Sequence, residues 1–324
     1  MWTKRDLLAA SAAAILWPLR VRAQAFPSKP LKILVPNAAG GAADLTARTV
    51  GQKLADALGQ PVVIDNRPSA GGIVAGEALS RSPADGHTLL LVSSGTAVSA
   101  ALFKSLPFDT QKDFAPVSML ATFDLGIVVA HDSRFKTLGE LVAYAKANPG
   151  KLNIGTPQIG TTQNLAAELF KSTAGIDAQI VPFNGTPPVI TAVRGGQLDA
   201  MLDILGPLMS QINAKALRPL AVLGAKRTAL LPEAPAARET GGSLAHFDVA
   251  SWNGLAVPAA TPKDVVARLS KEVNAALALP DVKQKLLDLS LIAQGSTPAQ
   301  LASQLDRDIK RWGEVIARAN IPKQ

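Results

Sequence analysis

Short apolar runs alternate with segments of helical periodicity from about residue 30 onwards. Residues 31–35 (LKILV) form a branched, apolar run that is typical of a buried strand. Residues 42–58 place their apolar side chains on one face of a helix, and Gly59 follows as a stop signal. Further strands are predicted at 61–66 and 87–94. Strands that alternate with helices at such distances predict a parallel sheet in an α/β protein.

A second series of the same kind follows. The pattern predicts strands at 125–132, 151–156, 178–183, 198–205 and 217–224, and helices at 137–150, 161–175 and 186–196. Two α/β blocks in tandem predict two lobes of similar size.

The last part of the chain is predicted to be almost wholly helical. Three helical patterns fill residues 262–324, and each opens with Thr-Pro or Pro-Asp, which favours a helix start. We interpret residues 251–259 as a crossover that returns to the first lobe. The expected organisation is therefore one lobe from residues 26–122 plus 252–324 and another from 123–251.

The first 25 residues have the layout of a secretory signal peptide. A basic start precedes an apolar stretch at 7–17, and small residues stand at Ala23 and Ala25, where cleavage is expected. The apolar stretch is too short to cross a bilayer. We expect residues 1–25 to be removed and the mature protein to be periplasmic, by either the general or the twin-arginine export route.

Composition and charge exclude some classes of partner and of functional site. Without residues 1–23, which carry a net charge of +3, the formal net charge falls from +8 to +5. These charges are scattered, so nucleic acid is not expected as a partner. The sequence has no cysteine, which excludes disulfides, thiol catalysis and thiolate metal sites.

Five predicted strand ends share an unusual chemistry. They are rich in glycine, hydroxyl and amide residues, and Asp44 and Asp203 are their only charged residues. The segments are PNAAGGAAD (36–44), SSGT (93–96), GTPQIGTTQ (155–163), PFNGT (182–186) and DILGP (203–207). Ligands of open α/β sheets bind beyond the carboxyl ends of strands, and the amide groups of helix starts attract anions. One such loop alone is more often a plain turn, but five of them together favour a site for a carboxylate.

Nucleotide, metal and catalytic sites are not indicated. The glycines at 40 and 41 match neither G-x-G-x-x-G nor a P-loop, and His87, His131 and His246 lie far apart in sequence. We therefore expect no cofactor, no metal and no enzymatic activity. Sugar sites use flat aromatic faces, and sugar binding is disfavoured because only Trp252, in the expected crossover, is well placed for a cleft, and packing at a hinge is at least as good an explanation for it.

The ordered motifs resemble the Bug family of periplasmic substrate-binding proteins, the receptors of tripartite tricarboxylate transporters. The resemblance runs along the whole chain through FPSKPLKILVPNAAGGAAD, QPVVIDNRPSAGG, ADGHTLLLVSSGT, PFDTQKDFAPVSMLA, NPGKLNIGTPQIGTTQNLAAELFKSTAG, VPFNGTPPVITAVRGGQLDAMLD and SWNGLAVPAATPKDVVARL. It implies a two-lobed periplasmic-binding-protein fold of the type II kind, with the ligand cleft between the lobes. The ligand is expected to be a di- or tricarboxylate, an acidic amino acid or an aromatic acid.

The resemblance also implies a set of ligand-binding residues. These are Gly40, Gly41, Asp44, Ser94, Thr96, Gly160, Thr161, Thr162, Gln163, Asn184, Gly185 and Asp203. The chain departs from the family at Asn37, Ala38 and Ala39, where an aromatic residue and prolines are common, and at Asn184, where lysine is common. These departures leave the identity of the ligand open.

We therefore expect a monomeric binding protein that delivers a small carboxylate to membrane permease subunits. A ligand-sensing partner of a signalling receptor and an exported enzyme on the same scaffold are the alternatives. For Asp44, a role as a helix cap and a role in binding both stay open.

Overall fold

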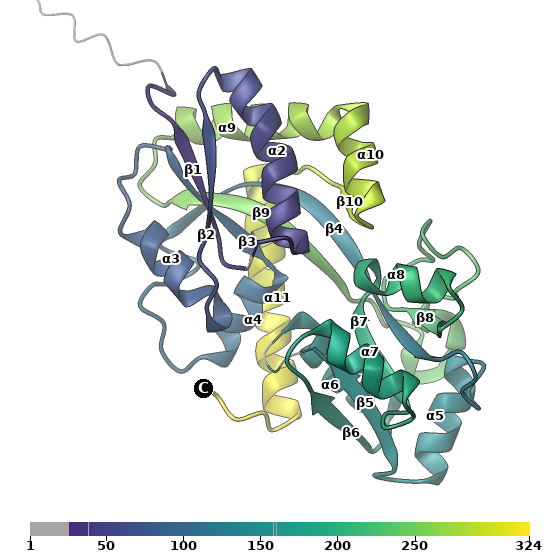
Figure 1. Cartoon of the computed structure of the whole chain (residues 1–324). Coiled ribbons are helices and arrows are strands. Elements are labelled where there is room, and N and C mark those ends of the chain that lie inside the picture. The colour runs from purple at the N-terminus through teal and green to yellow at the C-terminus, as the bar shows by residue number, and fades with distance from the viewer. Residues whose placement is uncertain (1–25, 38, 158, 160) are drawn as a thin grey trace, which may run out of the picture.

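The computed structural model describes residues 26–37, 39–157, 159 and 161–324, and its chain forms two α/β halves joined by long strands (Figure 1). The expected signal peptide (residues 1–25), Ala38 and the predicted site residue Gly160 lie outside the described residues. No described helix is both long and apolar enough to cross a membrane.

The first half begins with a parallel three-stranded unit in the order β2-β1-β3. Its elements are β1 (Leu31–Val35), α2 (Ala42–Leu58), β2 (Val62–Asn66), α3 (Ile73–Ser80), β3 (Thr88–Ser93) and α4 (Ser94–Leu102). The predicted strands and the helix ending at Gly59 are confirmed, and Gly59 caps α2 in the left-handed conformation. The segment 93–96, which we expected as a loop, is instead the N-cap and the first turn of α4.

The second half repeats this plan with β5 and its neighbours β6 and β7 in parallel. Its elements are α5 (Leu138–Ala147), β5 (Leu152–Thr156), α6 (Thr162–Ala174), β6 (Ala178–Pro182), α7 (Thr186–Arg194), β7 (Ala200–Ile204), α8 (Leu205–Asn213) and β8 (Leu217–Val222). The apolar stretches of both halves are buried, so the periodicity that predicted these elements reflects their packing.

Two long antiparallel strands connect the halves. The first is β4 (Phe114–Ala130), whose residues up to Asp124 pair with β9 (Ala250–Pro258) and whose residues from Leu125 pair with β7 and β8. The predicted parallel pairing is present within each half, in β2-β1-β3 and in β7-β5-β6, whereas β9 lies antiparallel between β3 and β4. The expected strand 125–132 is only the far end of β4, and the expected crossover 251–259 is the central strand β9. The lobe boundaries that we expected, 122/123 and 251/252, fall inside these two strands and stay a prediction.

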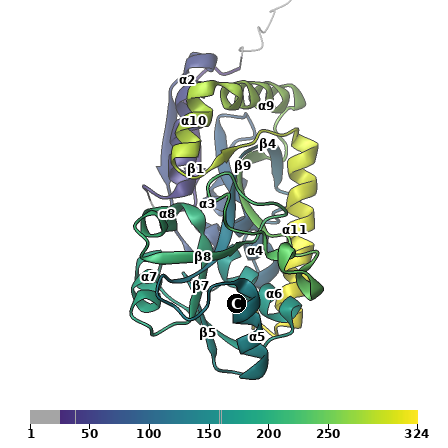
Figure 2. The same ribbon diagram turned by 90° about the vertical axis from the view of Figure 1, so that its right-hand side faces the viewer.

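The C-terminal segment packs back on the sheet. It comprises α9 (Lys263–Ala278), α10 (Pro280–Asp288), the short strand β10 (Ile292–Ala293) and α11 (Pro298–Arg318). The long helix α11 contacts α4 and β4 in the first half and α6 in the second, and Figure 2 shows it running along one side of both. Trp252 of β9 is buried and donates a hydrogen bond from Nε1 to Asp308 of α11 (2.7 Å), so its role here is to tie the joining strand to this helix.

Candidate functional site

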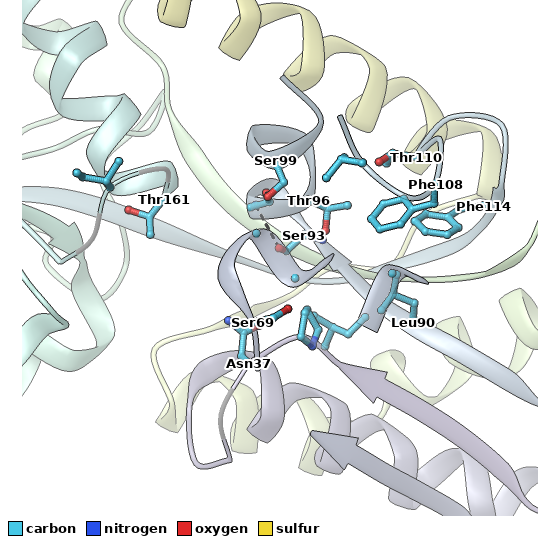
Figure 3. A pocket seen from close by; sticks show the side chains of 18 residues that line it. Asn37, Ser69, Leu90, Ser93, Thr96, Ser99, Phe108, Thr110, Phe114 and Thr161 are labelled. Carbon is cyan, nitrogen blue, oxygen red and sulfur yellow. Dashed lines mark hydrogen bonds between the residues drawn. The ribbon is translucent and has the colours of Figure 1, made fainter. Parts of the chain in front are cut away.

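A cavity of about 150 Å³ lies at the carboxyl ends of β1 and β3, where α3 and α4 begin (Figure 3). Eighteen residues line it, and most come from the first half of the molecule. Ile159 and Thr161, from the loop between β5 and α6, are contributed by the second half. The cavity therefore lies where the two halves meet, at the edge of the sheet where ligands of α/β proteins bind.

Hydroxyl groups at the start of α4 form one wall. Ser93 is the N-cap of α4, and its Oγ accepts a hydrogen bond from the Gly95 amide (3.1 Å). The hydroxyl of Thr96 accepts a hydrogen bond from the Ser93 amide (3.0 Å), which completes a reciprocal cap. Ser99 stands one turn further along the same face and donates to the Gly95 carbonyl (2.9 Å). These side chains are thus held in place by the helix start itself.

A glycine pair ahead of α3 forms the adjacent wall. Gly71 and Gly72 both have positive φ angles (+63° and +69°), which residues with a Cβ rarely adopt. A Cβ on Gly72 would lie 2.9 Å from the Cβ of Pro36, and a Cβ on Gly71 would lie 2.6 Å from the ring of Phe103. The two loops that carry Pro36 and Gly72 approach each other this closely only because glycine stands here.

The other side of the cavity is aromatic. The rings of Phe108 and Phe114 lie 5.1 Å apart, and Leu90 of β3 joins them in the lining. Figure 3 shows these three residues on one side of the pocket with Thr110 beside them, and Asn37 and Ser69 away from them.

Gly76 of α3 sets the position of the Phe108 ring. A Cβ on this glycine would lie 2.4 Å from the Phe108 Cζ atom, so the ring packs directly on the helix backbone. The aromatic side of the cavity is therefore fixed by α3, the same helix whose start forms the polar side.

The electrostatics of the cavity come from helix starts rather than from charged side chains. The N-cap residues of α3, α4 and α6, which are Gly72, Ser93 and Thr161, all line it. None of the eighteen lining residues has an ionisable side chain. Helix N-termini carry a partial positive charge, so this arrangement favours an anion and needs no arginine or lysine.

The predicted residues of the loop between β1 and α2 stand behind the cavity rather than in its lining. Asp44 is buried, and its carboxylate accepts hydrogen bonds from the Gly40 amide (2.8 Å), Arg48 (3.0 Å) and Asn66 (3.0 Å). Burial by itself raises the pKa of the Asp44 carboxyl, but these hydrogen bonds outweigh it and lower the pKa below its usual value. Gly41 is the N-cap of α2. The geometry thus gives Asp44 a role in holding the loop around Gly40.

Three buried hydroxyls join the halves beside the cavity. The predicted residues Ser94 and Thr162 meet here, because the Thr162 hydroxyl donates to Ser94 Oγ (3.0 Å). Ser94 Oγ also shares a short hydrogen bond with Ser251 of β9. Thr96 and Thr161 are the predicted residues that line the cavity itself.

The remaining predicted residues gather at the start of α6 and the end of β7. Asp203 is buried and accepts hydrogen bonds from Gln163 (3.2 Å) and Thr186 (2.7 Å) and from the Ile204 amide (2.7 Å). Burial raises the pKa of the Asp203 carboxyl, and the hydrogen bonds only partly oppose this. Asn184 and Gly185 lie in the neighbouring loop between β6 and α7, outside the cavity lining.

Several cavity residues were not predicted from the sequence. They are Ser69, Gly71, Gly72, Gly76, Leu90, Leu91, Ser99, Leu106, Phe108, Thr110 and Phe114, whereas Pro36, Asn37, Ser93, Gly95 and Ile159 stand in the predicted strand-end segments but were not among the predicted ligand-binding residues. The double glycine ahead of α3 was a usable sequence signal, because glycine permits a close approach of the backbone. Phe108 and Thr110 gave no signal of their own, because they lie in a loop without periodicity. Within the described ranges, no cluster of His, Asp or Glu has the geometry of a metal site.

The sequence is similar to those of known transporter receptors. The model of a family described as "Tripartite tricarboxylate transporter family receptor" matches residues 46–321. BugT of Bordetella pertussis is 32% identical over 303 residues, which cover 91% of this chain and 91% of BugT.

Two solved structures have the same fold. The periplasmic binding protein BugD is 28% identical, with a TM-score of 0.78 over 92% of this chain and 100% of that one. MatC from Rhodopseudomonas palustris, solved with bound malate, is 32% identical, with a TM-score of 0.76 over 90% and 100%. The two halves described above are therefore the lobes of a periplasmic-binding-protein fold, as the sequence predicted.

Proposed function

Because this chain belongs to the family of tripartite tricarboxylate transporter receptors, we propose that it captures a small carboxylate between its lobes and delivers it to permease subunits in the membrane. It is a carboxylate-binding solute receptor, and its relative MatC holds malate.

The observation that carries the proposal is the anion-binding character of the cavity. Three helix N-caps, Gly72, Ser93 and Thr161, line it, together with the hydroxyls of Thr96 and Ser99. Amide and hydroxyl donors can hold a carboxylate, and the absence of a lysine or arginine among the described lining residues keeps the ligand readily releasable. Release is needed in a protein that hands its ligand on.

The proposed motion is a hinge that closes the lobes on the ligand. The strands β4 and β9 run from one half to the other, and bending within them changes the distance between Thr96 and Thr161. A ligand that contacts both lobes favours the closed state by its differential affinity for that state. We propose the lobe boundaries at 122/123 and 251/252, inside these strands.

We assign different roles to the predicted site residues. Thr96 and Thr161 contact the ligand, and Ser94 and Thr162 join the lobes around it. Asp44 shapes the loop of Gly40 and Gly41, while Asp203 orients Gln163 at the start of α6. Gly160, Asn184 and Gly185 are proposed to border the same cleft.

The cellular setting follows from the family. We propose that residues 1–25 are removed on export, that the mature protein is a periplasmic monomer, and that it has no enzymatic activity, no cofactor and no nucleic-acid partner. The matching family is one of transporter receptors, which supports a binding function rather than an enzymatic one.

Calorimetry and thermal melting of the mature protein against a panel of organic acids test the proposal. We expect at least one acid to bind and to raise the melting temperature. Mass spectrometry of ligand that co-purifies after gentle isolation identifies the class directly. Binding of sugars or metals with no response to any acid contradicts the proposal. Capture of a sensor kinase without permease subunits favours the sensing alternative, and conversion of a bound acid into product favours the enzyme.

A further inference from the structure

One wall of the ligand cavity is also the wall of a second hollow. The second hollow is a groove of about 560 Å³ between α4, α11 and the loop 103–111. Three residues, Leu106, Phe108 and Thr110, line both the cavity and the groove. Phe108 has the largest side chain of the three, so its ring makes up most of the wall between the two spaces.

The groove lies at the surface of the molecule. Among its lining residues, Lys104, Ser105 and Pro107 are exposed. On the cavity side of the wall, Leu90 and Phe114 are buried. The wall therefore separates a small interior space from the solvent, and loss of its largest side chain would join the cavity to the groove.

The ring of Phe108 is held in a defined position. A Cβ on Gly76 would lie 2.4 Å from the Phe108 Cζ atom and 2.5 Å from its Cε1 atom, so the ring rests on the backbone of α3. The ring of Phe114 packs against it at 5.1 Å. A helix backbone in a packed core does not yield readily, so the ring is a fixed stop.

A ligand that is anchored at the helix starts has this ring ahead of it. Figure 3 shows Ser93 and Thr96 between Thr161, which belongs to the second lobe, and Phe108. A carboxylate held at Ser93 and Thr96 directs the rest of the molecule either towards the second lobe or towards the ring. The cavity has a volume of about 150 Å³, and a cavity of this size in another protein holds one benzene molecule. The ring side therefore has room for a short chain only.

A longer chain meets two costs at the ring. Additional methylene groups have to displace a well-packed aromatic side chain, and such overpacking is unfavourable. A second carboxylate at the end of a longer chain would lie against Phe108 and Phe114, where a charge is left without water or a partner. Both costs disappear when the wall is open, because the end of the chain then reaches the groove and the solvent.

We propose that the ring of Phe108, seated on Gly76, sets the upper limit for the chain length of the bound acid. The inference rests on the proposed function and assigns a specificity-determining residue within the same site. A four-carbon acid ends before the ring, whereas a longer unbranched acid presses on it.

Titration calorimetry with two series of unbranched acids tests this proposal. The monocarboxylates are butanoate, hexanoate and octanoate, and the dicarboxylates are succinate, adipate and suberate. The protein is first unfolded and refolded to remove bound ligand. In at least one series, we expect the unaltered protein to bind the eight-carbon acid about tenfold more weakly than the four-carbon acid.

The variant Phe108→Ala removes the ring and joins the cavity to the groove. It should reduce the difference between the four-carbon and eight-carbon acids to about twofold, because the longer chain no longer displaces a packed ring. Phe103→Ala is the matched control on the same loop, because Phe103 lines the groove but is not among the described residues of the cavity lining. We expect this control to leave the ratio of the two affinities at its original value.

The variant Gly76→Ala tests the seat of the ring. The added Cβ displaces the Phe108 ring, so the ratio of the four-carbon to the eight-carbon affinity should change. In the double variant with Phe108→Ala there is no ring to displace, and we expect Gly76→Ala to have no further effect on this ratio. An equal change in both backgrounds contradicts the role of the seat.

The outcomes separate this inference from the proposed function. Equal affinities of the unaltered protein for four-carbon and eight-carbon acids overturn the inference, as does a ratio that Phe108→Ala leaves unchanged. Phe108→Leu, a smaller change, provides the same test if Phe108→Ala does not fold. If neither series binds while another acid of the broader panel does, the inference fails and the proposed function stands. If the folded protein binds no organic acid, the proposed function fails as well.

Discussion

The hydroxyl of Thr162, in the first turn of α6, donates a hydrogen bond to the hydroxyl of Ser94, in the first turn of α4 (3.0 Å). Both side chains are buried, and the two helices belong to different lobes. A hydrogen bond between lobes exists only while the lobes are together, so it contributes to the stability of this state and not to that of a separated one.

The variant Thr162→Val should therefore weaken ligand binding. Loss of a buried hydrogen bond costs about 1 kcal/mol, which corresponds to about a fivefold higher dissociation constant. Calorimetry with the tightest acid of the panel measures this. Thr162→Ser keeps the hydroxyl and is expected to bind nearly as the unaltered protein does. Equal affinities of all three proteins would show that the contact does not contribute to closure.

The variant Asp44→Asn should lose stability but retain affinity. The new amide group places a donor against one of the donors on Arg48, Gly40 and Asn66, which costs about 1–3 kcal/mol. Urea unfolding near neutral pH measures the loss. Asp56→Asn, on the exposed side of the same helix, is the control and should change little. A drop in affinity larger than the drop in stability would instead assign Asp44 to the ligand.

The contribution of Asp44 to the stability of the folded protein should change with pH in one direction. Its folded-state pKa is lowered, so its contribution is present above the unfolded-state pKa and is lost as the pH falls through the folded-state value. The stability difference between the unaltered protein and Asp44→Asn should therefore shrink in acid.

Asp203 should show the opposite pH dependence. Burial raises its folded-state pKa, so its favourable contribution is fully present below the unfolded-state pKa and is lost as the pH rises through the folded-state value. An amide at this position does not titrate. We therefore expect the melting temperature of Asp203→Asn, relative to the unaltered protein, to rise from acid towards neutral pH. A difference that stays constant across this range would contradict the raised pKa.

The variant Gly72→Ala should damage the wall of the cavity. Its φ of +69° costs an alanine about 1–2 kcal/mol, and the new Cβ would also press on Pro36. Gly196→Ala is a matched control, because Gly196 has a φ of +71° and open space around its Cβ position. We expect Gly72→Ala to unfold at a lower denaturant concentration than Gly196→Ala and to bind acids less well. Equal losses would mean that the loops adjust to the added Cβ at no cost.

Local patterns predicted the elements that are built from local contacts. The strand 31–35 and the helix 42–58 were correct because each has its own periodicity and stop signal. The antiparallel strand β9 was missed as a strand, because its partners β3 and β4 lie more than a hundred residues earlier and leave no trace in its own sequence. Strand direction is a property of the assembled sheet.

The same limit applied to the prediction of the site, because local patterns identify only residues with a local signal. The hydroxyl and glycine residues of the strand ends pointed to the edge of the sheet where the cavity lies, and Thr96 and Thr161 line that cavity. The aromatic side was not foreseen, because Phe108 packs against Gly76 of a distant helix and Phe114 packs against Phe108. Contacts of this kind depend on tertiary structure and have no short-range signature.

The position of β9 also bears on the order in which the molecule assembles. During synthesis, β3 and β4 emerge long before residues 250–258, yet these two strands never pair with each other and each pairs with β9. The first lobe therefore cannot complete its sheet until β9 has been synthesised, whereas the second lobe is made from one continuous stretch of chain. Contacts between distant segments slow folding. We conclude that the sheet of the first lobe is completed only by a strand from the C-terminal part of the chain, so a truncation before residue 250 removes a strand from the middle of that sheet.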